Sequence, residues 1–201
     1  MNILPYHNID IDILAEELNM GKILVMPTET SYGLIGDACS DLVVKKIFAI
    51  KNRPDFKPLP IIFDSYSRVV EYCQVPELLR DLAQRYWPGP FSIVVKPIDD
   101  RLKANPSNEF EGTVAVRVTS DLILQDLIRI FKRPLIATSA NISGESNCYD
   151  SKELIKSFDN NLEKPDFVID KGVLSNTKPS TLVAVESGKI KVLRQGPIEL
   201  D

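Results

Sequence analysis

The sequence contains a single histidine, His7, which lies near the start of the chain outside any periodic segment. Histidine is the side chain whose ordinary pKa lies closest to neutrality, and it is the commonest zinc ligand. Histidine-based acid–base catalysis and histidine-rich zinc sites are therefore nearly excluded. Any chemistry must depend on hydroxyls, carboxylates, lysine, arginine, backbone donors or reactants that need no protein base.

Cysteine is also scarce, and long apolar runs are absent. Cys39, Cys73 and Cys148 are far apart and odd in number, so they indicate neither a disulfide framework nor a CxxC metal site. No apolar run approaches the roughly 20 residues that span a bilayer, and the N-terminus lacks the basic start and apolar stretch of a secretory signal. We therefore expect a cytoplasmic protein with no membrane contact and no resident metal.

Basic residues do not dominate the composition. Lysine and arginine number 24 against 28 aspartates and glutamates, which gives a formal net charge of −4. This balance argues against a nucleic-acid binder held by bulk charge, although it leaves room for a local basic patch.

The 201 residues suit a single domain spanning residues 1–201. The spacing of apolar residues predicts helices over residues 10–20, 41–50, 65–73, 76–86, 122–131 and 151–158, with Asp41 available to cap the second. It predicts strands over residues 22–26, 58–63, 91–96, 113–118, 134–137, 167–169, 181–185 and 189–193. This mixed alternation predicts an α/β fold, an open and twisted sheet with parallel and antiparallel pairs and flanking helices.

Three polar segments follow predicted elements at places where α/β proteins bind ligands. Residues 27–34 combine hydroxyl side chains with Gly33, and residues 137–144 combine small hydroxyls with Asn141. Residues 51–58 place three cations beside two prolines, as a polyphosphate site would require. Each segment also has a structural interpretation: the first and last as turns that satisfy their own backbone, and the basic one as a solvated helix end.

Several short motifs occur in the order found in one enzyme family. They are Pro-Thr-Glu-Thr-x-Tyr-Gly-Leu at 27–34, Lys-x-Arg-Pro at 51–54, Trp-Pro-Gly-Pro at 87–90, Ala-Val-Arg-Val at 115–118, Ser-Ala-Asn-x-Ser-Gly at 139–144, Pro-Ser-Thr at 179–181 and Arg-x-Gly at 194–196. In this order the chain resembles the single-domain YrdC/TsaC-like threonylcarbamoyl-AMP synthase family. The resemblance implies a twisted α/β fold with a concave basic cavity.

The resemblance also implies a reaction and a set of site residues. The family joins L-threonine, bicarbonate and ATP into threonylcarbamoyl-AMP, with Mg²⁺ carried on the nucleotide. The product passes to tRNA threonylcarbamoyl transferase proteins for threonylcarbamoyladenosine modification of tRNA. The matching positions imply catalytic roles for Lys51 and Arg53, ATP contacts from Arg53, Lys57, Thr113, Asn141 and Arg194, and threonine contacts from Thr30, Arg117, Ser139 and Ser180.

Two features leave parts of this assignment open. After Gly144 many relatives have a Pro-Thr pair where this chain reads Glu-Ser-Asn-Cys-Tyr, so no contact is carried over to residues 145–149. Glu29 lies between two threonines and receives no role. The competing interpretation is a non-catalytic module that binds structured RNA in the basic cavity. Clustered hydroxyls beside few cations favour the enzyme.

Overall fold

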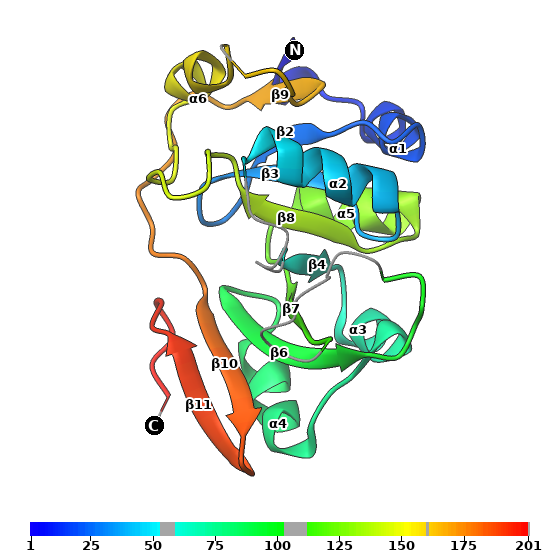
Figure 1. Cartoon of the computed structure of the whole chain (residues 1–201), viewed down its shortest axis with the longest axis vertical. Coiled ribbons are helices and arrows are strands. Elements are labelled where there is room, and N and C mark those ends of the chain that lie inside the picture. The colour runs from blue at the N-terminus through cyan, green and yellow to red at the C-terminus, as the bar shows by residue number, and fades with distance from the viewer. Residues whose placement is uncertain (53–58, 103–111, 160, 201) are drawn as a thin grey trace.

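The computed structural model describes residues 1–52, 59–102, 112–159 and 161–200, which form one long mixed β-sheet with helices beside it (Figure 1). The sheet has the order β1-β9-β2-β3-β8-β4-β7-β6-β10-β11, and β5 pairs with β6 outside this path. The pairs β1/β9, β2/β9, β4/β7 and β6/β10 are parallel, and the remaining pairs are antiparallel. The prediction of a mixed α/β sheet is confirmed.

The strands have the following bounds: β1 Asn2–Pro5, β2 Leu24–Pro27, β3 Tyr32–Asp37, β4 Ile61–Phe63, β5 Cys73–Gln74, β6 Phe91–Pro97, β7 Val114–Val118, β8 Leu135–Ser139, β9 Phe167–Asp170, β10 Thr181–Glu186 and β11 Lys189–Arg194. The helices are α1 Ile11–Asn19, α2 Asp41–Ile50, α3 Tyr66–Tyr72, α4 Glu77–Tyr86, α5 Leu122–Phe131 and α6 Ser151–Phe158, with a short 3₁₀ turn at Tyr6–Asn8. None of the helices in these described ranges is long and apolar enough to cross a membrane.

Side-chain alternation along the central strands divides the interior into two apolar clusters. In β4, Ile61 and Phe63 join the larger cluster, whereas Ile62 between them joins the smaller one. Apolar residues of α2, α3, α4 and α6 belong to the larger cluster, and those of α1 and α5 to the smaller. The central strands are therefore covered on both faces, which leaves strand ends and turns as the places for ligand contacts.

The structure corrects several sequence-based expectations. The first motif is not a loop throughout, because Pro27 ends β2 and residues from Tyr32 onward form β3. The short strands β1 and β5 were not predicted. Asp41 does not cap α2; the hydroxyl of Ser40 accepts the hydrogen bond from the Val43 amide instead.

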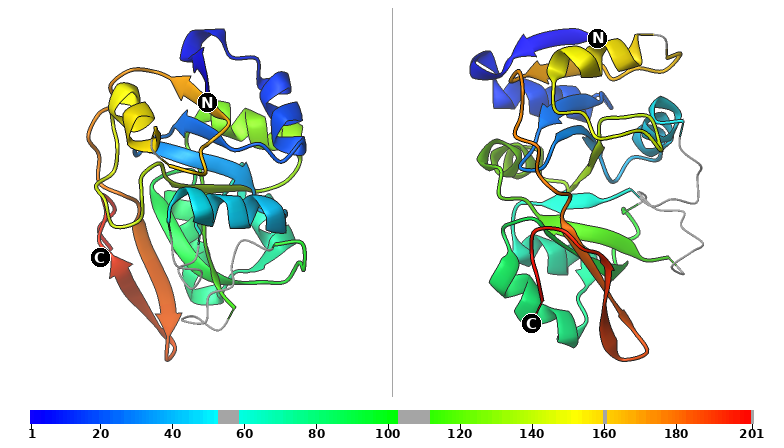
Figure 2. Two further views of the ribbon diagram at one scale, coloured as in Figure 1. Left: turned by 45° about the horizontal axis from the view of Figure 1, so that its top comes forward. Right: turned by 90° about the vertical axis from the view of Figure 1, so that its left-hand side faces the viewer.

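The fold brings distant segments together near the middle of the sheet. Strand β3 pairs with β8, so that Gly33 lies opposite Ser139. After β9 the chain runs down one side of the molecule to β10, which pairs with β6 (Figure 2). This connection carries residues 171–180 past the turn between β2 and β3, where Thr177 donates a hydrogen bond to the carbonyl of Thr30 at 2.7 Å.

Candidate functional site

The turn between β2 and β3 is organised by one threonine hydroxyl. The Oγ1 of Thr28 donates to the Ser31 carbonyl at 2.8 Å and accepts from the amides of Thr30 and Ser31 at 3.1 and 3.3 Å. The turn therefore satisfies its own backbone, as the structural interpretation of this motif requires. It also presents Thr30 and Ser31 to a cavity, so the structural and ligand interpretations hold together.

The turn that follows β8 is held by a buried lysine at the end of α2. The side chain of Lys51 is 1% exposed. Its Nζ donates to the Ser139 carbonyl at 2.5 Å, to the Asn141 carbonyl at 2.8 Å and to Asn141 Oδ1 at 3.0 Å. The Ser139 hydroxyl donates to the same Asn141 Oδ1 at 2.6 Å, so its oxygen lone pairs are free to accept from a ligand.

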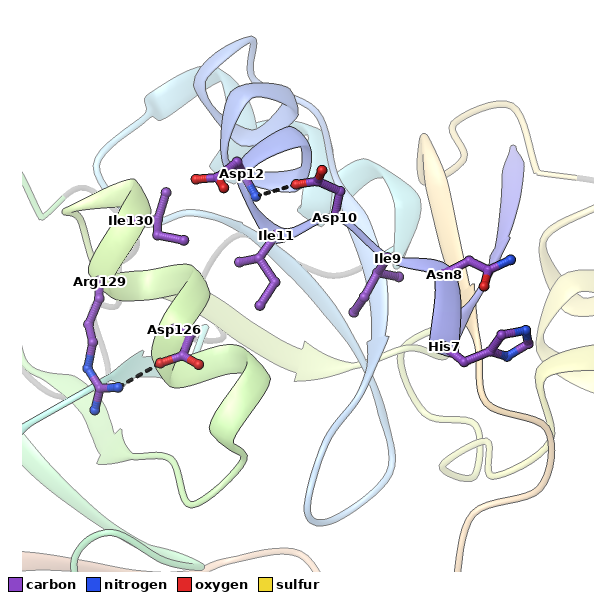
Figure 3. A pocket seen from close by; sticks show the side chains of 9 residues that line it. All are labelled: His7, Asn8, Ile9, Asp10, Ile11, Asp12, Asp126, Arg129 and Ile130. Atoms are coloured by element: carbon purple, nitrogen blue, oxygen red, sulfur yellow. Dashed lines mark hydrogen bonds and ion pairs between the residues drawn. The ribbon is translucent and has the colours of Figure 1, made fainter.

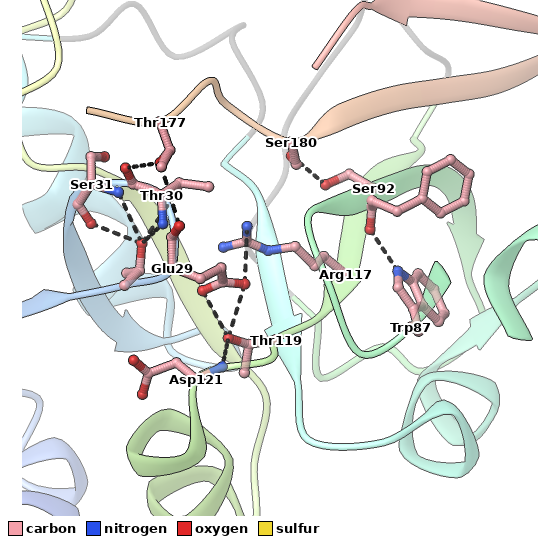
Figure 4. A network of polar contacts seen from close by, with 12 residues as sticks. Glu29, Thr30, Ser31, Trp87, Ser92, Arg117, Thr119, Asp121, Thr177 and Ser180 are labelled. Atoms are coloured by element: carbon pink, nitrogen blue, oxygen red, sulfur yellow. Dashed lines mark hydrogen bonds and ion pairs between the residues drawn. The ribbon is translucent and has the colours of Figure 1, made fainter. Parts of the chain in front are cut away.

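Arg117 enters the site from near the end of β7 and is paired with an acidic side chain (Figure 4). Its Nη1 lies 3.3 Å from Oε1 of Glu29, and both side chains are largely buried. The hydroxyl of Thr119 lies 3.2 and 3.1 Å from the two carboxylate oxygens of Glu29. The guanidinium is thus held from one side, while Arg117 also lines the cavity.

A second guanidinium approaches from the end of β11. Arg194 donates to the Ser180 carbonyl at 2.9 Å and to the Ser180 hydroxyl at 3.0 Å, and that hydroxyl shares a hydrogen bond with Ser92 at 2.8 Å. Burial, together with the positive charge of Arg117, lowers the pKa of Arg194. Within the described chain Arg194 pairs with no carboxylate, so its charge is available to an anion.

These groups surround one cavity with a volume of about 120 Å³. That volume is well below the roughly 300 to 1,000 Å³ of drug-sized pockets, so it suits a small polar molecule rather than a whole nucleotide. The lining residues are Thr30, Ser31, Ile61, Ile62, Ser92, Arg117, Ala137, Ser139, Asn147, Pro179, Ser180 and Arg194. Hydroxyls and two cations converge beside a short apolar wall, which is an arrangement that can hold an amino acid.

The structure gathers most of the predicted site residues. Thr30, Arg117, Ser139, Ser180 and Arg194 all line the cavity, and Lys51 and Asn141 lie directly behind the Ser139 wall. Thr113 precedes β7 and is not among the lining residues. Arg53 and Lys57 lie outside the described residues.

Two polar lining residues, Ser92 and Asn147, lie outside the motifs that the sequence analysis singles out. Ser92 lies inside a strand, where a serine gives no local signal, and only the pairing of β6 with β10 brings it to Ser180. Asn147 lies in the segment that departs from the family pattern, where a small polar side chain was the only available hint.

A larger hollow of about 810 Å³ lies elsewhere, between the start of α1 and α5 (Figure 3). Two of its three carboxylates are already engaged: Asp10 caps α1 through the Asp12 and Ile13 amides, and Asp126 pairs with Arg129. Polar groups that satisfy one another leave little for a ligand, so the smaller cationic cavity is the better candidate. No three histidine, cysteine or acidic side chains of the described ranges come together as metal ligands would.

Fold and cavity together define an α/β protein with a small, cationic, hydroxyl-lined ligand site. The model of the Sua5/YciO/YrdC family, described as "Telomere recombination", matches residues 16–196. A provisionally named threonylcarbamoyl-AMP synthase of Methanocaldococcus jannaschii is 31% identical over 190 residues, covering 94% of this chain and 87% of that protein. The chain belongs to the Sua5/YciO/YrdC family.

Solved structures of this family have the same fold. Sua5 of P. abyssi, complexed with L-threonine, is 31% identical and matches with a TM-score of 0.83, over 98% of this chain and 58% of that one. YciO of E. coli matches with a TM-score of 0.81 at 22% identity, over 98% and 96% of the two chains, and shows the fold alone. The chain therefore spans about three fifths of the length of the Sua5 structures.

Proposed function

We propose that this chain is an L-threonylcarbamoyladenylate synthase, a nucleotidyltransferase that uses L-threonine, bicarbonate and ATP. The observation that carries the proposal is the convergence of Thr30, Arg117, Ser139 and Ser180 on one cavity of amino-acid size. These residues were assigned to threonine from the sequence motifs alone, and they come from four separate parts of the chain. The relative named as a threonylcarbamoyl-AMP synthase and the L-threonine complex of Sua5 support the same activity.

Several of the cavity groups have a part in holding threonine. The guanidinium of Arg117 offers cationic donors to the amino acid carboxylate. The Ser139 hydroxyl, whose proton is used by Asn141, offers an acceptor to the ammonium or hydroxyl group. Ile61, Ile62 and Ala137 supply an apolar wall for the methyl group. The positive charge of Arg194 is available to an anion, and we propose that this anion is a phosphate of ATP.

The reaction needs little proton transfer from the protein. The threonine amine and bicarbonate form N-carboxy-threonine and water, and the new carboxylate oxygen attacks the α-phosphorus of ATP. The bond from that phosphorus to the bridging oxygen breaks, which releases pyrophosphate and leaves threonylcarbamoyl-AMP. Because the nucleophile is already anionic, positioning and charge stabilisation carry the catalysis, in agreement with a chain that has one histidine.

The nucleotide side of the site remains a set of predictions. Lys51, Arg53, Lys57, Thr113 and Asn141 are proposed to act there with Arg194, and Mg²⁺ is expected to arrive on the phosphates. No step above depends on that ion. The product is proposed to serve tRNA threonylcarbamoyl transferase proteins.

The test is a pyrophosphate-release assay with each reactant omitted in turn. Release is expected only when threonine, bicarbonate and ATP are all present. Valine, which lacks the hydroxyl, is expected to lower kcat/KM about 100-fold or more, because cavity hydroxyls would lose their partner. Equal rates with valine and threonine, or binding of structured RNA without any response to the small substrates, would overturn the proposal in favour of an RNA-binding module.

A further inference from the structure

Glu29 stands beside the cavity without lining it. It follows Thr28 in the turn between β2 and β3, and it borders a separate hollow of about 330 Å³ that also includes Thr30. The residues of the threonine cavity include Thr30 and Arg117 but not Glu29. Glu29 therefore does not contact a ligand in that cavity, and it acts there through its charge and through the groups that it holds.

The contact that matters is the ion pair with Arg117. Oε1 of Glu29 lies 3.3 Å from Nη1 of Arg117, and the two side chains are 15% and 10% exposed. An arginine has many rotamers, and holding it in one orientation before the ligand arrives removes an entropic cost from binding. Because the pair is mostly shielded from water, salt screens it less than a surface pair.

The carboxylate itself is fixed from behind by Thr119 (Figure 4). The Thr119 hydroxyl accepts from the Asp121 amide at 3.2 Å, so its single proton is directed to the Glu29 oxygens at 3.1 and 3.2 Å. Thr119 is fully buried and anchored at both ends, since its amide donates to the Phe63 carbonyl and its carbonyl accepts from the Gln125 side chain. A chain of contacts thus runs from the start of α5 to the guanidinium.

We propose that Glu29, held by Thr119, is a positioning residue that fixes the guanidinium of Arg117 for the carboxylate of the amino acid substrate. The inference rests on the proposed function, because it takes threonine as the ligand. Glu29 also offsets the repulsion between Arg117 and Arg194, the two cations of the same cavity. It does both without touching the ligand.

Positioning and simple electrostatics predict opposite results for Glu29→Gln. Removing a negative charge makes the cavity more positive, which by itself would tighten binding of an anionic carboxylate. Loss of orientation weakens binding, because the guanidinium must then be ordered when threonine binds, and ordering one rotamer-rich side chain costs up to about tenfold in affinity. We expect orientation to dominate, with the Kd and KM for threonine rising severalfold, up to about tenfold, and the KM for ATP unchanged.

The experiment compares four variants with the wild type by calorimetric titration of threonine, steady-state kinetics and thermal unfolding. Thr119→Val removes the hydroxyl but keeps the charge of Glu29, and it is expected to weaken threonine binding in the same direction. Thr119→Ser restores the hydroxyl and is expected to restore binding. Asp37→Asn is the matched control, because Asp37 pairs with Arg133 at 3.1 Å outside this cavity and should leave threonine binding unchanged.

The outcomes separate this inference from the proposed function. A wild-type protein that binds no threonine refutes both. Wild-type binding with equal or tighter binding by Glu29→Gln refutes the positioning role alone. Should Glu29→Gln fail to fold, the Thr119 variants decide: unchanged threonine affinity in Thr119→Val overturns the inference, and weaker affinity that Thr119→Ser restores supports it.

Discussion

Replacing Lys51 with methionine tests whether this buried cation builds the site or acts in the reaction. Methionine keeps the apolar stem and removes the three hydrogen bonds that Nζ donates to the turn after β8. Two of the acceptors keep another donor: the Ser139 carbonyl retains the Asn141 amide, and Asn141 Oδ1 retains the Ser139 hydroxyl. Among the described residues, the Asn141 carbonyl has no second donor.

The expected loss of stability follows from the number of acceptors that keep another donor. An unpaired buried carbonyl costs about 1–3 kcal/mol, and each of the other two lost hydrogen bonds costs about 1 kcal/mol. The variant no longer buries an ammonium group, which offsets part of this loss. We therefore expect a net destabilisation of about 2–4 kcal/mol, or a fall in Tm of about 10 °C for a chain of this length.

The assay is thermal unfolding followed by circular dichroism, with pyrophosphate release measured in parallel. The control is Lys45→Met, because Lys45 is exposed on the same helix and its replacement should change stability by no more than about 0.5 kcal/mol. A Lys51→Met variant that melts within about 2 °C of the wild type but releases no pyrophosphate would refute this reasoning. Such a result would show that Lys51 acts in the reaction, as proposed above, and contributes little to the stability of the turn.

Two further predictions concern threonine binding after a substitution near the end of the chain and the pH dependence of stability. Gly196→Ala is expected to weaken threonine binding, because an added Cβ would collide with the backbone of residues 179–181 and displace the cavity-lining Ser180. The affinity is measured by titration of threonine, and an unchanged affinity would contradict the prediction. Burial alone would raise the pKa of Asp166, but hydrogen bonds, chiefly from Lys46, lower it below its usual value. The free energy of unfolding of the wild type should therefore exceed that of Asp166→Asn by its full amount at pH 7. This difference should shrink as the pH falls below about 4, as measured by urea unfolding at pH 7 and below pH 4. A constant difference would contradict it.

Local sequence patterns predicted most of the elements because most are amphipathic and capped. The bounds predicted for α5 and α6 match the structure, and the side chains of Asp121 and Asp150 accept hydrogen bonds from the first amides of these helices. Strand β3 was missed for a physical reason. All of its residues are buried, so it shows no alternation, and it follows directly on a hydroxyl-rich turn that resembles a loop.

The site residues were found through motifs, whereas their connections were not. The local sequence predicts that Lys51 is a solvated cation at a helix end, but its hydrogen-bond acceptors lie 88 and 90 positions further along the chain. The contact between Glu29 and Thr119 also spans 90 positions. Such contacts depend on which strands become neighbours, and no local period encodes that order. The sequence motifs therefore named many of the site residues, including Lys51, but not the contacts between them.

The distribution of charge favours a small anionic ligand over RNA. A polyanion needs many cations spread over a surface, and its affinity depends on how many phosphates they neutralise. This chain has a net charge of −4, and two of its arginines line a cavity of about 120 Å³, one of them paired with Glu29. A net negative charge repels a large polyanion at long range, while the guanidinium groups that line the cavity act at short range on whatever fits between the hydroxyls. Selectivity thus arises from confinement of the positive charge rather than from its amount.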